Sequence, residues 1–182
     1  MKRILSVALF LIMVIGVVGT SAALASDNGL EEGALDHIVL EGEPGDIVVV
    51  GDLTFKCISN EEMDQRISGP MPLSSTMRFS NIQLSGTEMS RSFEMTSNYP
   101  WAKVWIQNTN NGTIEFTITK GSETGYVVKG SACTIPANSN WEVWATKEWD
   151  PDMYYANFTS GKSGLKGTTS CRVASTQPEL DL

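Results

Sequence analysis

An alternation of apolar and polar residues with a period of two runs through most of the chain after residue 46. Successive side chains of a strand point to opposite faces, so this alternation predicts half-buried β-strands. Clusters of Gly, Asn, Ser and Pro separate most of the segments, and none of them shows a sustained helical stripe with caps. Short strands at such intervals indicate an antiparallel sandwich or barrel. We therefore expect an all-β fold, an antiparallel β-sandwich of jelly-roll or immunoglobulin-like type. The expected strands are 46–50, 53–59, 76–84, 88–96, 101–107, 113–120, 125–129, 132–135, 141–147, 154–159 and 168–173.

One hairpin is predicted in detail, from residues 101–107 and 113–119 with a five-residue loop between them. In this register Ile106 faces Ile114 and Val104 faces Phe116, so the aliphatic rows of both strands share one face. Residues 141–147 repeat the alternation. The opposite face then carries what we call the Trp row: Trp101, Lys103, Trp105, Glu115 and, from the later strand, Trp144.

The Trp row is the candidate ligand-binding surface. Exposed flat aromatic rings stack on sugar faces, while neighbouring charges and Thr hydroxyls bond the ring hydroxyls. This favours a non-catalytic binding module for a carbohydrate or a cell-envelope polymer. Two alternatives remain open, because Trp is usually well buried. The row packs against a second sheet, a loop or the acidic N-terminal segment, or it contacts another protein and binds no small ligand.

The first 25 residues have the pattern of a secretory signal peptide. Lys2 and Arg3 precede an apolar run over residues 4–18, and small residues ending Ala23-Leu24-Ala25 follow. We expect export with cleavage after Ala25, cleavage after Ala23 being the second choice and an uncleaved anchor the alternative. The expected location is therefore secreted or extracellular, and the only expected membrane contact is through the signal peptide before cleavage.

The acidity of the chain is local. The formal net charge is −8, yet residues 26–66 hold 11 acidic residues against Lys56 and Arg66. An acidic chain of this kind argues against a nucleic-acid partner, because phosphates require a basic surface. We expect four parts: a signal peptide over 1–25, an acidic N-terminal segment over 26–72 with strands within 46–59, a β-sandwich over 73–175, and a C-terminal tail over 176–182.

An exported chain meets oxidising conditions, so its three cysteines allow one internal disulfide. Cys133 and Cys171 both lie in expected strands and form the preferred pair. The alternative is that Cys57, Cys133 and Cys171 are small buried hydrophobic residues. No C-x-x-C motif or metal-ligand spacing is present, so we expect neither a metal nor a cofactor.

Catalysis is the least supported interpretation. A glycosidase needs two carboxylates at a defined separation, and no pair of acidic residues is singled out. Asp150-Pro151-Asp152 is typical of a turn. No G-x-S-x-G motif exists, and His37 is the only histidine. We expect no catalytic residues, and a small secreted hydrolase is the last alternative.

The second half of the chain also carries a resemblance. It rests on residues 98–109, 118–122 and 154–161, and on the endings Arg172-Val173-Ala174-Ser175 and Glu179-Leu180-Asp181-Leu182. These segments resemble a group of small uncharacterised secreted proteins of Gram-positive, clostridia-like bacteria. An extracellular polysaccharide or an envelope protein is the partner expected from the Trp row, independently of this resemblance. The resemblance itself implies a signal peptide, a small all-β domain and bacterial origin. It implies no activity.

Overall fold

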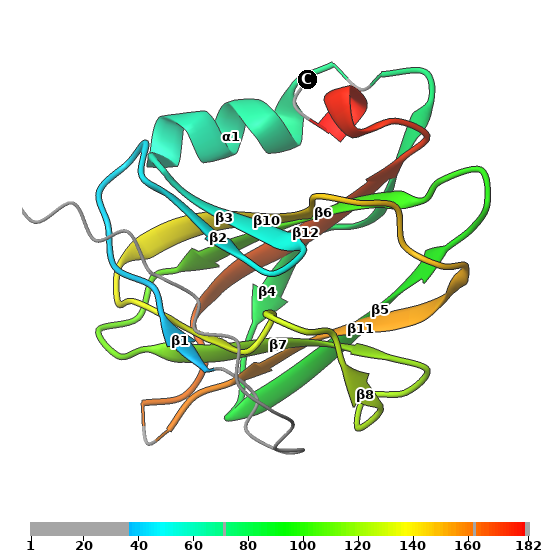
Figure 1. Ribbon diagram of the computed structural model, residues 1–182. Helices are drawn as coiled ribbons and strands as arrows, with labels where there is room; N and C mark the ends of the chain where they lie inside the picture. The colour runs from blue at the N-terminus through cyan, green and yellow to red at the C-terminus, as the bar shows by residue number, and fades with distance from the viewer. Residues whose placement is uncertain (1–36, 71, 162, 181–182) are drawn as a thin grey trace, which may run out of the picture. The chain divides into compact units, whose positions relative to one another are not determined.

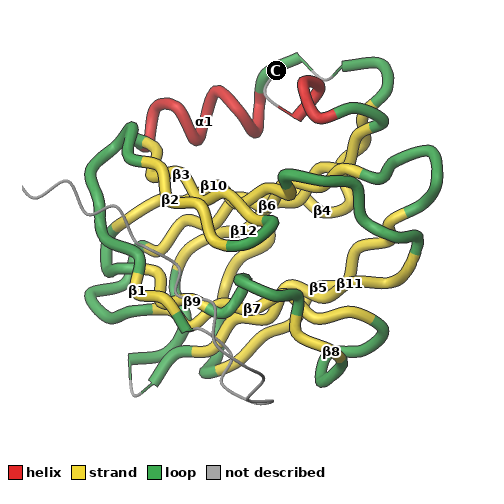
Figure 2. The backbone as a smooth tube through the Cα atoms, viewed as in Figure 1, coloured by secondary structure: helices red, strands yellow, loops and turns green. Residues whose placement is uncertain are grey.

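A computed structural model describes residues 37–70, 72–161 and 163–180 of the chain (Figure 1). The predicted signal peptide and residues 26–36 of the acidic segment lie outside these ranges. In the described part the chain forms two packed sheets, as Figure 2 shows. The prediction of an all-β sandwich is therefore confirmed.

The strands of the described residues divide into two six-stranded sheets. Sheet A has the order β1-β9-β7-β11-β5, with β8 paired to β7, and sheet B has the order β2-β3-β10-β6-β12-β4. All pairings are antiparallel except that of β1 with β9. The bounds in sheet A are β1 Ile38–Val39, β5 Glu88–Met95, β7 Ile114–Lys120, β8 Tyr126–Val127, β9 Cys133–Ile135 and β11 Asp152–Thr159. The bounds in sheet B are β2 Ile47–Val50, β3 Leu53–Ile58, β4 Ser75–Leu84, β6 Trp101–Asn108, β10 Ser139–Ala145 and β12 Gly167–Ala174.

The pairings describe one long hairpin rolled over itself. One arm is β4, β5, β6 and β7, and the returning arm pairs with it in reverse order, as β4 with β12, β5 with β11, β6 with β10 and β7 with β9. Both arms cross between the sheets at each step, and rolling adds the contacts of β6 with β12 and of β7 with β11. This is the jelly-roll topology, which is the first of the two expected types.

The predicted hairpin of residues 101–107 and 113–119 is wrong. β6 and β7 follow each other along one arm, so they lie in different sheets and do not pair. Their aliphatic rows nevertheless share the core between the sheets, where Val104, Ile106, Ile114 and Phe116 are buried together. Alternation sets which face each residue occupies, whereas the partner of each strand depends on the distant returning arm.

The N-terminal segment contributes to the sandwich itself. β2 and β3 form a hairpin within the expected 46–59 range, and β3 pairs with β10 inside sheet B. The hairpin starts at a bulge in which Gly45, with φ +107, donates its N–H to the Cys57 carbonyl, while the Cys57 N–H donates to Asp46. The boundary expected at residue 72 therefore does not separate an acidic segment from the sandwich.

The expected Cys133–Cys171 disulfide is also wrong. Cys133 lies on β9 of sheet A and Cys171 on β12 of sheet B, and both are buried as free thiols, as is Cys57. Packed sheets stand about 10 Å apart. A disulfide needs a Cα–Cα distance of roughly 4.4–6.8 Å. The structure agrees with the alternative, in which these cysteines act as small hydrophobic residues.

A helix that the period-two analysis missed, α1 (Asn60–Ser68), follows β3 directly. Ser59 caps it by accepting a hydrogen bond from the Glu62 N–H at 3.1 Å, and Glu61 and Glu62 stand in the first turn. The C-terminal tail adds a short 3₁₀ helix, η1 (Gln177–Leu180), whose Leu180 is buried. Neither helix of the described ranges has the length and apolarity that crossing a bilayer requires.

Candidate functional site

The Trp row does not form an exposed platform. Trp105 and Lys103 of β6 are both 0% exposed, while Trp101 and Trp144 are half-buried. The fifth member, Glu115, belongs to β7 in sheet A and so lies on the other sheet. The expectation that Trp105 stacks on a ligand is therefore wrong, because a fully buried ring cannot present its face to one.

Helix α1 covers the outer face of sheet B at this place (Figure 1). Trp105 packs in a small apolar cluster with Ile58 and Met63, and Ile67 and Met77 border it. The indole N–H of Trp105 has no hydrogen-bond partner among the described residues. The face thus packs against part of the segment 26–72, which is the packing alternative for the Trp row.

A buried ion pair lies beside this cluster. The Lys103 Nζ is 3.3 Å from Glu142 Oε2, and their side chains are 0% and 2% exposed. The same ammonium stands 4.7 Å from the ring centre of Trp144 and 5.9 Å from that of Trp105. Charges that are so deeply buried are tolerated only when they are paired. Three members of the Trp row, Lys103, Trp105 and Trp144, therefore take part in a structural contact with Glu142.

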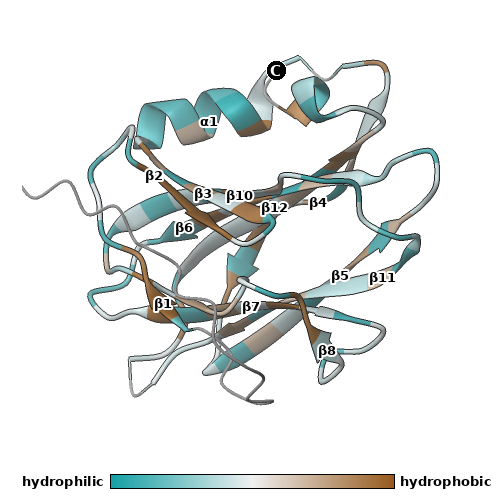
Figure 3. Cartoon of the chain, in the orientation of Figure 1, coloured by the Kyte–Doolittle hydropathy of each residue, from teal (hydrophilic) through white to brown (hydrophobic). Residues whose placement is uncertain are grey.

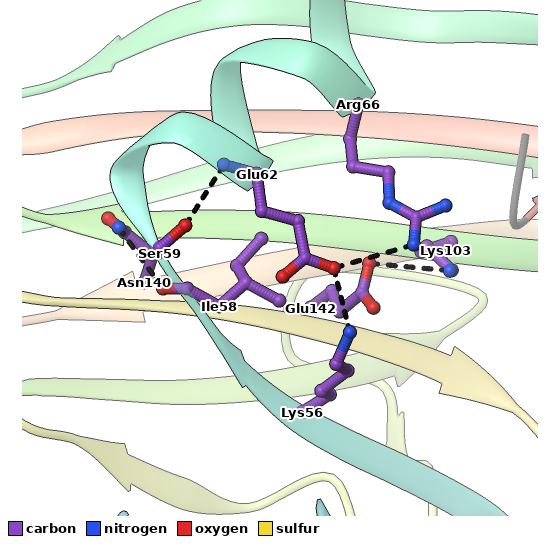
Figure 4. A network of polar contacts seen from close by, with 8 residues as sticks. All are labelled: Lys56, Ile58, Ser59, Glu62, Arg66, Lys103, Asn140 and Glu142. Carbon is purple, nitrogen blue, oxygen red and sulfur yellow. Dashed lines mark hydrogen bonds and ion pairs between the residues drawn. The ribbon is translucent and has the colours of Figure 1, made fainter. Parts of the chain in front are cut away.

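Helix α1 adds a second, partly exposed set of ion pairs at the edge of this face (Figure 4). Glu62 Oε1 lies 2.7 Å from the Lys56 Nζ and 3.4 Å from Arg66. The hydrogen bond from Lys56 lowers the pKa of the Glu62 carboxyl, with Arg66 acting in the same direction. Beneath the helix, burial and the charge of Arg66 lower the pKa of Arg172. These contacts fix α1 onto sheet B.

Glu115, the remaining member of the Trp row, ties the start of the described chain to sheet A. Its Oε2 is 3.0 Å from His37 Nε2, and Thr134 Oγ1 is 2.9 Å from the same carboxylate and 2.7 Å from His37. His37 immediately precedes β1, which pairs with β9. The sequence predicted neither partner of Glu115, because both contacts depend on how the strands pair.

The strongest candidate site is a cleft of about 350 Å³ that we call the end cleft. It lies where the turn between β2 and β3, the hairpin of β7 and β8, and the loop between β10 and β11 come together. Its size is at the lower end of the range for small-molecule sites. The end cleft is lined by Asp52, Lys120, Tyr126, Val127, Val128, Lys129, Lys147, Glu148, Trp149, Asp150 and Tyr154.

Aromatic rings line the end cleft at two levels. Trp149 and Tyr154 stack with their ring centres 4.7 Å apart, and Phe93 of β5 stacks on both from the core. Trp149 and Tyr154 are only 8% and 4% exposed, so the rest of the protein holds them in place. Tyr126 on β8 is 88% exposed. The end cleft therefore combines a fixed aromatic wall with one free ring at its rim.

Charged groups supply the polar part of the end cleft. Lys120 Nζ is 3.0 Å from Asp150 Oδ2, and Lys147 forms an ion pair with Asp52. The hydrogen bond to Asp150 raises the pKa of Lys120. Burial raises the pKa of the Tyr154 hydroxyl, and the nearby Lys120 opposes that shift. Paired lysines and carboxylates offer donors and acceptors side by side with little net charge.

Sequence reasoning missed the end cleft. It treated Asp150-Pro151-Asp152 as a turn, whereas the structure places Asp150 and Pro151 in the loop before β11, which begins at Asp152; the expected strands 113–120 and 125–129 pair as the hairpin of β7 and β8. An aromatic residue beside each of these two loops, Tyr126 and Trp149, was the available signal. That signal has meaning only once the two loops are known to meet. Among the described residues no group of His, Cys, Asp or Glu side chains has the geometry of a metal site.

The chain matches no protein-family model, and comparisons with curated proteins and with solved structures find no match to it. The resemblance to secreted clostridia-like proteins therefore stays a prediction.

Proposed function

We propose that this protein is a secreted, non-catalytic binding module that holds a carbohydrate in the end cleft. The observation that carries the proposal is the exposed ring of Tyr126 beside the ion-paired groups of the cleft. A sugar offers an apolar ring face for stacking and hydroxyls that both donate and accept. The end cleft offers matching groups for both, whereas the buried Trp105 does not.

Preorganisation supports the proposal. The stacking of Trp149 on Tyr154, and of Phe93 on both, fixes the wall of the end cleft before any ligand arrives. Lys120 is held in place by Asp150. A site whose side chains are already ordered loses less conformational entropy on binding. Tyr126 is the exception, and we expect its ring to become ordered when it stacks on the ligand.

The ion pairs also favour binding over hydrolysis. A glycosidase requires one carboxyl that is protonated and free to give its proton to the leaving group. In the end cleft Asp52 and Asp150 are each paired with a lysine, and the third acidic residue of the lining, Glu148, is exposed. Together with the predicted signal peptide, this supports a module that recognises an extracellular polysaccharide or an envelope polymer.

The test is retention on insoluble glycans, with chitin, cellulose, xylan and peptidoglycan as probes. Soluble fragments of whichever glycan retains the protein are then titrated, and the tryptophan fluorescence of the protein is followed. We expect Tyr126→Ala to weaken binding by about tenfold, equivalent to a loss of about 1.4 kcal/mol. The matched control is Tyr155→Ala, because Tyr155 lies on β11 outside the end cleft.

Three outcomes contradict the proposal. The first is that none of the glycans retains the protein. The second is that Tyr126→Ala binds as well as the control Tyr155→Ala and the unaltered chain. The third is that new reducing ends appear during incubation. The last outcome points to a hydrolase instead.

A further inference from the structure

The outer edge of β2 is a second surface, and its chemistry does not depend on the end cleft. Among the described residues β2 is the last strand on its side of sheet B. The Cys57 N–H donates to the Asp46 carbonyl between β3 and the start of β2. Because hydrogen-bonded positions alternate along antiparallel strands, Val48 and Val50 bond to β3. The N–H and C=O groups of Ile47 and Val49 consequently point away from the sheet.

The side chains at these two positions are apolar and exposed. Ile47 is 58% exposed and Val49 is 64% exposed, and Figure 3 shows β2 in the hydrophobic colour. Edge strands usually carry charges, prolines or bulges that prevent pairing with another chain. Residues 47–50 contain none of these, and the bulge at Gly45 and Asp46 limits the regular edge to these four residues.

The other long edge strands are protected. β5 carries the exposed charged residues Glu88, Arg91 and Glu94. β4 is irregular where it pairs with β12, and its Asn81 has a φ of +50. β2 therefore differs from both in keeping a regular and uncharged edge. A regular edge with exposed aliphatic side chains is suited to accept another strand.

The charges around β2 are distributed unequally between its two ends. Glu41, Glu43 and Asp46 are exposed before the strand, with no Lys or Arg between residues 37 and 55. After the strand, the Lys129 carbonyl lies beside Gly51, and Lys147 pairs with Asp52. The start of the strand is thus acidic apart from Lys56, which pairs with Glu62, whereas its end carries Lys129 and the ion pair of Lys147 with Asp52. An antiparallel second copy would place each acidic end beside the lysine-bearing end of the other.

We propose that β2 pairs with β2 of a second copy of this chain, antiparallel and about a two-fold axis at Val48. This register sets Ile47 opposite the partner's Val49, and Val49 opposite the partner's Ile47. Both are hydrogen-bonded positions, so the two edges exchange four backbone hydrogen bonds. The four aliphatic side chains then cover one another on one face, and sheet B continues from one protomer into its partner.

The test measures mass and amide exchange together on the full-length mature protein. Light scattering over a concentration series is expected to show a mass that rises from one copy toward two. Over the same series, hydrogen exchange at the amides of Ile47 and Val49 is expected to slow. Val49→Lys places a charge on the shared face, and the mass is then expected to remain that of one copy.

The matched control is Leu73→Lys, which adds the same charge outside β2 at an aliphatic residue that is fully exposed. This variant is expected to associate as the unaltered chain does. Ile47→Lys provides a second test at the other exposed position of β2, and circular dichroism checks that each variant is folded. A mass of one copy at every concentration overturns the proposal. So does an association that both Val49→Lys and Ile47→Lys leave unchanged, since it then uses another surface.

Discussion

The buried pair of Lys103 and Glu142 leads to a sharp prediction about stability. In the variant Lys103→Met, the Glu142 carboxylate keeps its burial, at 2% exposure, but loses the ammonium 3.3 Å away. Breaking one side of a buried pair costs about 3–5 kcal/mol, because the remaining charge is uncompensated. For a domain of this size each kcal/mol lowers Tm by roughly 2–4 °C. We therefore expect a fall of roughly 6–20 °C.

The double variant Lys103→Met/Glu142→Leu separates the pair from the packing of its side chains. Replacing both members of a buried pair by apolar residues of similar volume is often neutral or stabilising. We expect the double variant to be more stable than Lys103→Met alone by at least about 2 kcal/mol, in line with the penalty that a lone buried charge carries. Urea unfolding followed by circular dichroism measures both free energies of unfolding.

The exposed pair of the end cleft is the control for this experiment. In Lys120→Met the partner Asp150 has a side chain that is 84% exposed, so water replaces the lost contact. Pairs of this kind contribute about 0–1 kcal/mol. If Lys103→Met costs no more than Lys120→Met, the Lys103 ammonium reaches water and the account of its burial is refuted. If the double variant is less stable than Lys103→Met, the penalty belongs to packing and not to the lone charge.

Two further predictions concern titration and thiol chemistry. The hydrogen bond from Lys56 lowers the pKa of Glu62 in the folded protein below its ordinary value of 4.5, so it stabilises the fold above that pH and is lost as pH falls through the lowered pKa. Glu62→Gln should reduce the loss of Tm on acidification by an amount equivalent to about 0.5–1 kcal/mol, and an unchanged acid profile would show that Glu62 contributes nothing. Burial raises the pKa of the Cys133 and Cys171 thiols, so neither should react with a thiol reagent at neutral pH until urea unfolds the chain. Rapid labelling of either in the native protein would contradict their burial.

Apart from β1, which was not expected, the described strands were predictable because each one depends on a local pattern. Every expected strand has a counterpart in the structure, and the expected 101–107 becomes β6, Trp101–Asn108. The face that each residue occupies was also predictable from the alternation, as the buried Val104 and Phe116 show. The pairing of β6 was not predictable, because its partners β10 and β12 lie more than thirty residues away. Nothing in the sequence of either strand identifies β6 as the strand with which it pairs.

The prediction of the candidate site failed for the same reason, because it also depended on contacts between distant segments. The sequence showed correctly that Trp105 points away from the core between the sheets, but not that α1 covers it. Ser59 and Glu62 form a helix-capping signature. The apolar period of two in the flanking segments nevertheless led to a prediction of strands alone, without the nine residues of α1. The end cleft was beyond reach as well. Its residues come from three separate stretches of the chain, at the β2–β3 turn, the β7–β8 hairpin and the start of β11, and Asp52 and Asp150 are almost a hundred positions apart.

The rolled hairpin has a consequence for how the protein acquires its fold. β12 lies between β6 and β4 in sheet B, yet among the described strands it is the last along the chain. Strand β4 gains its partner strand only through β12, where Ala174 pairs with Ser75 from almost a hundred residues further along the chain. Loop closure over such distances makes folding slow, because entropy is lost before the contacts form. Sheet B therefore cannot be completed before β12 has been synthesised, and β4 stays without its partner strand until then.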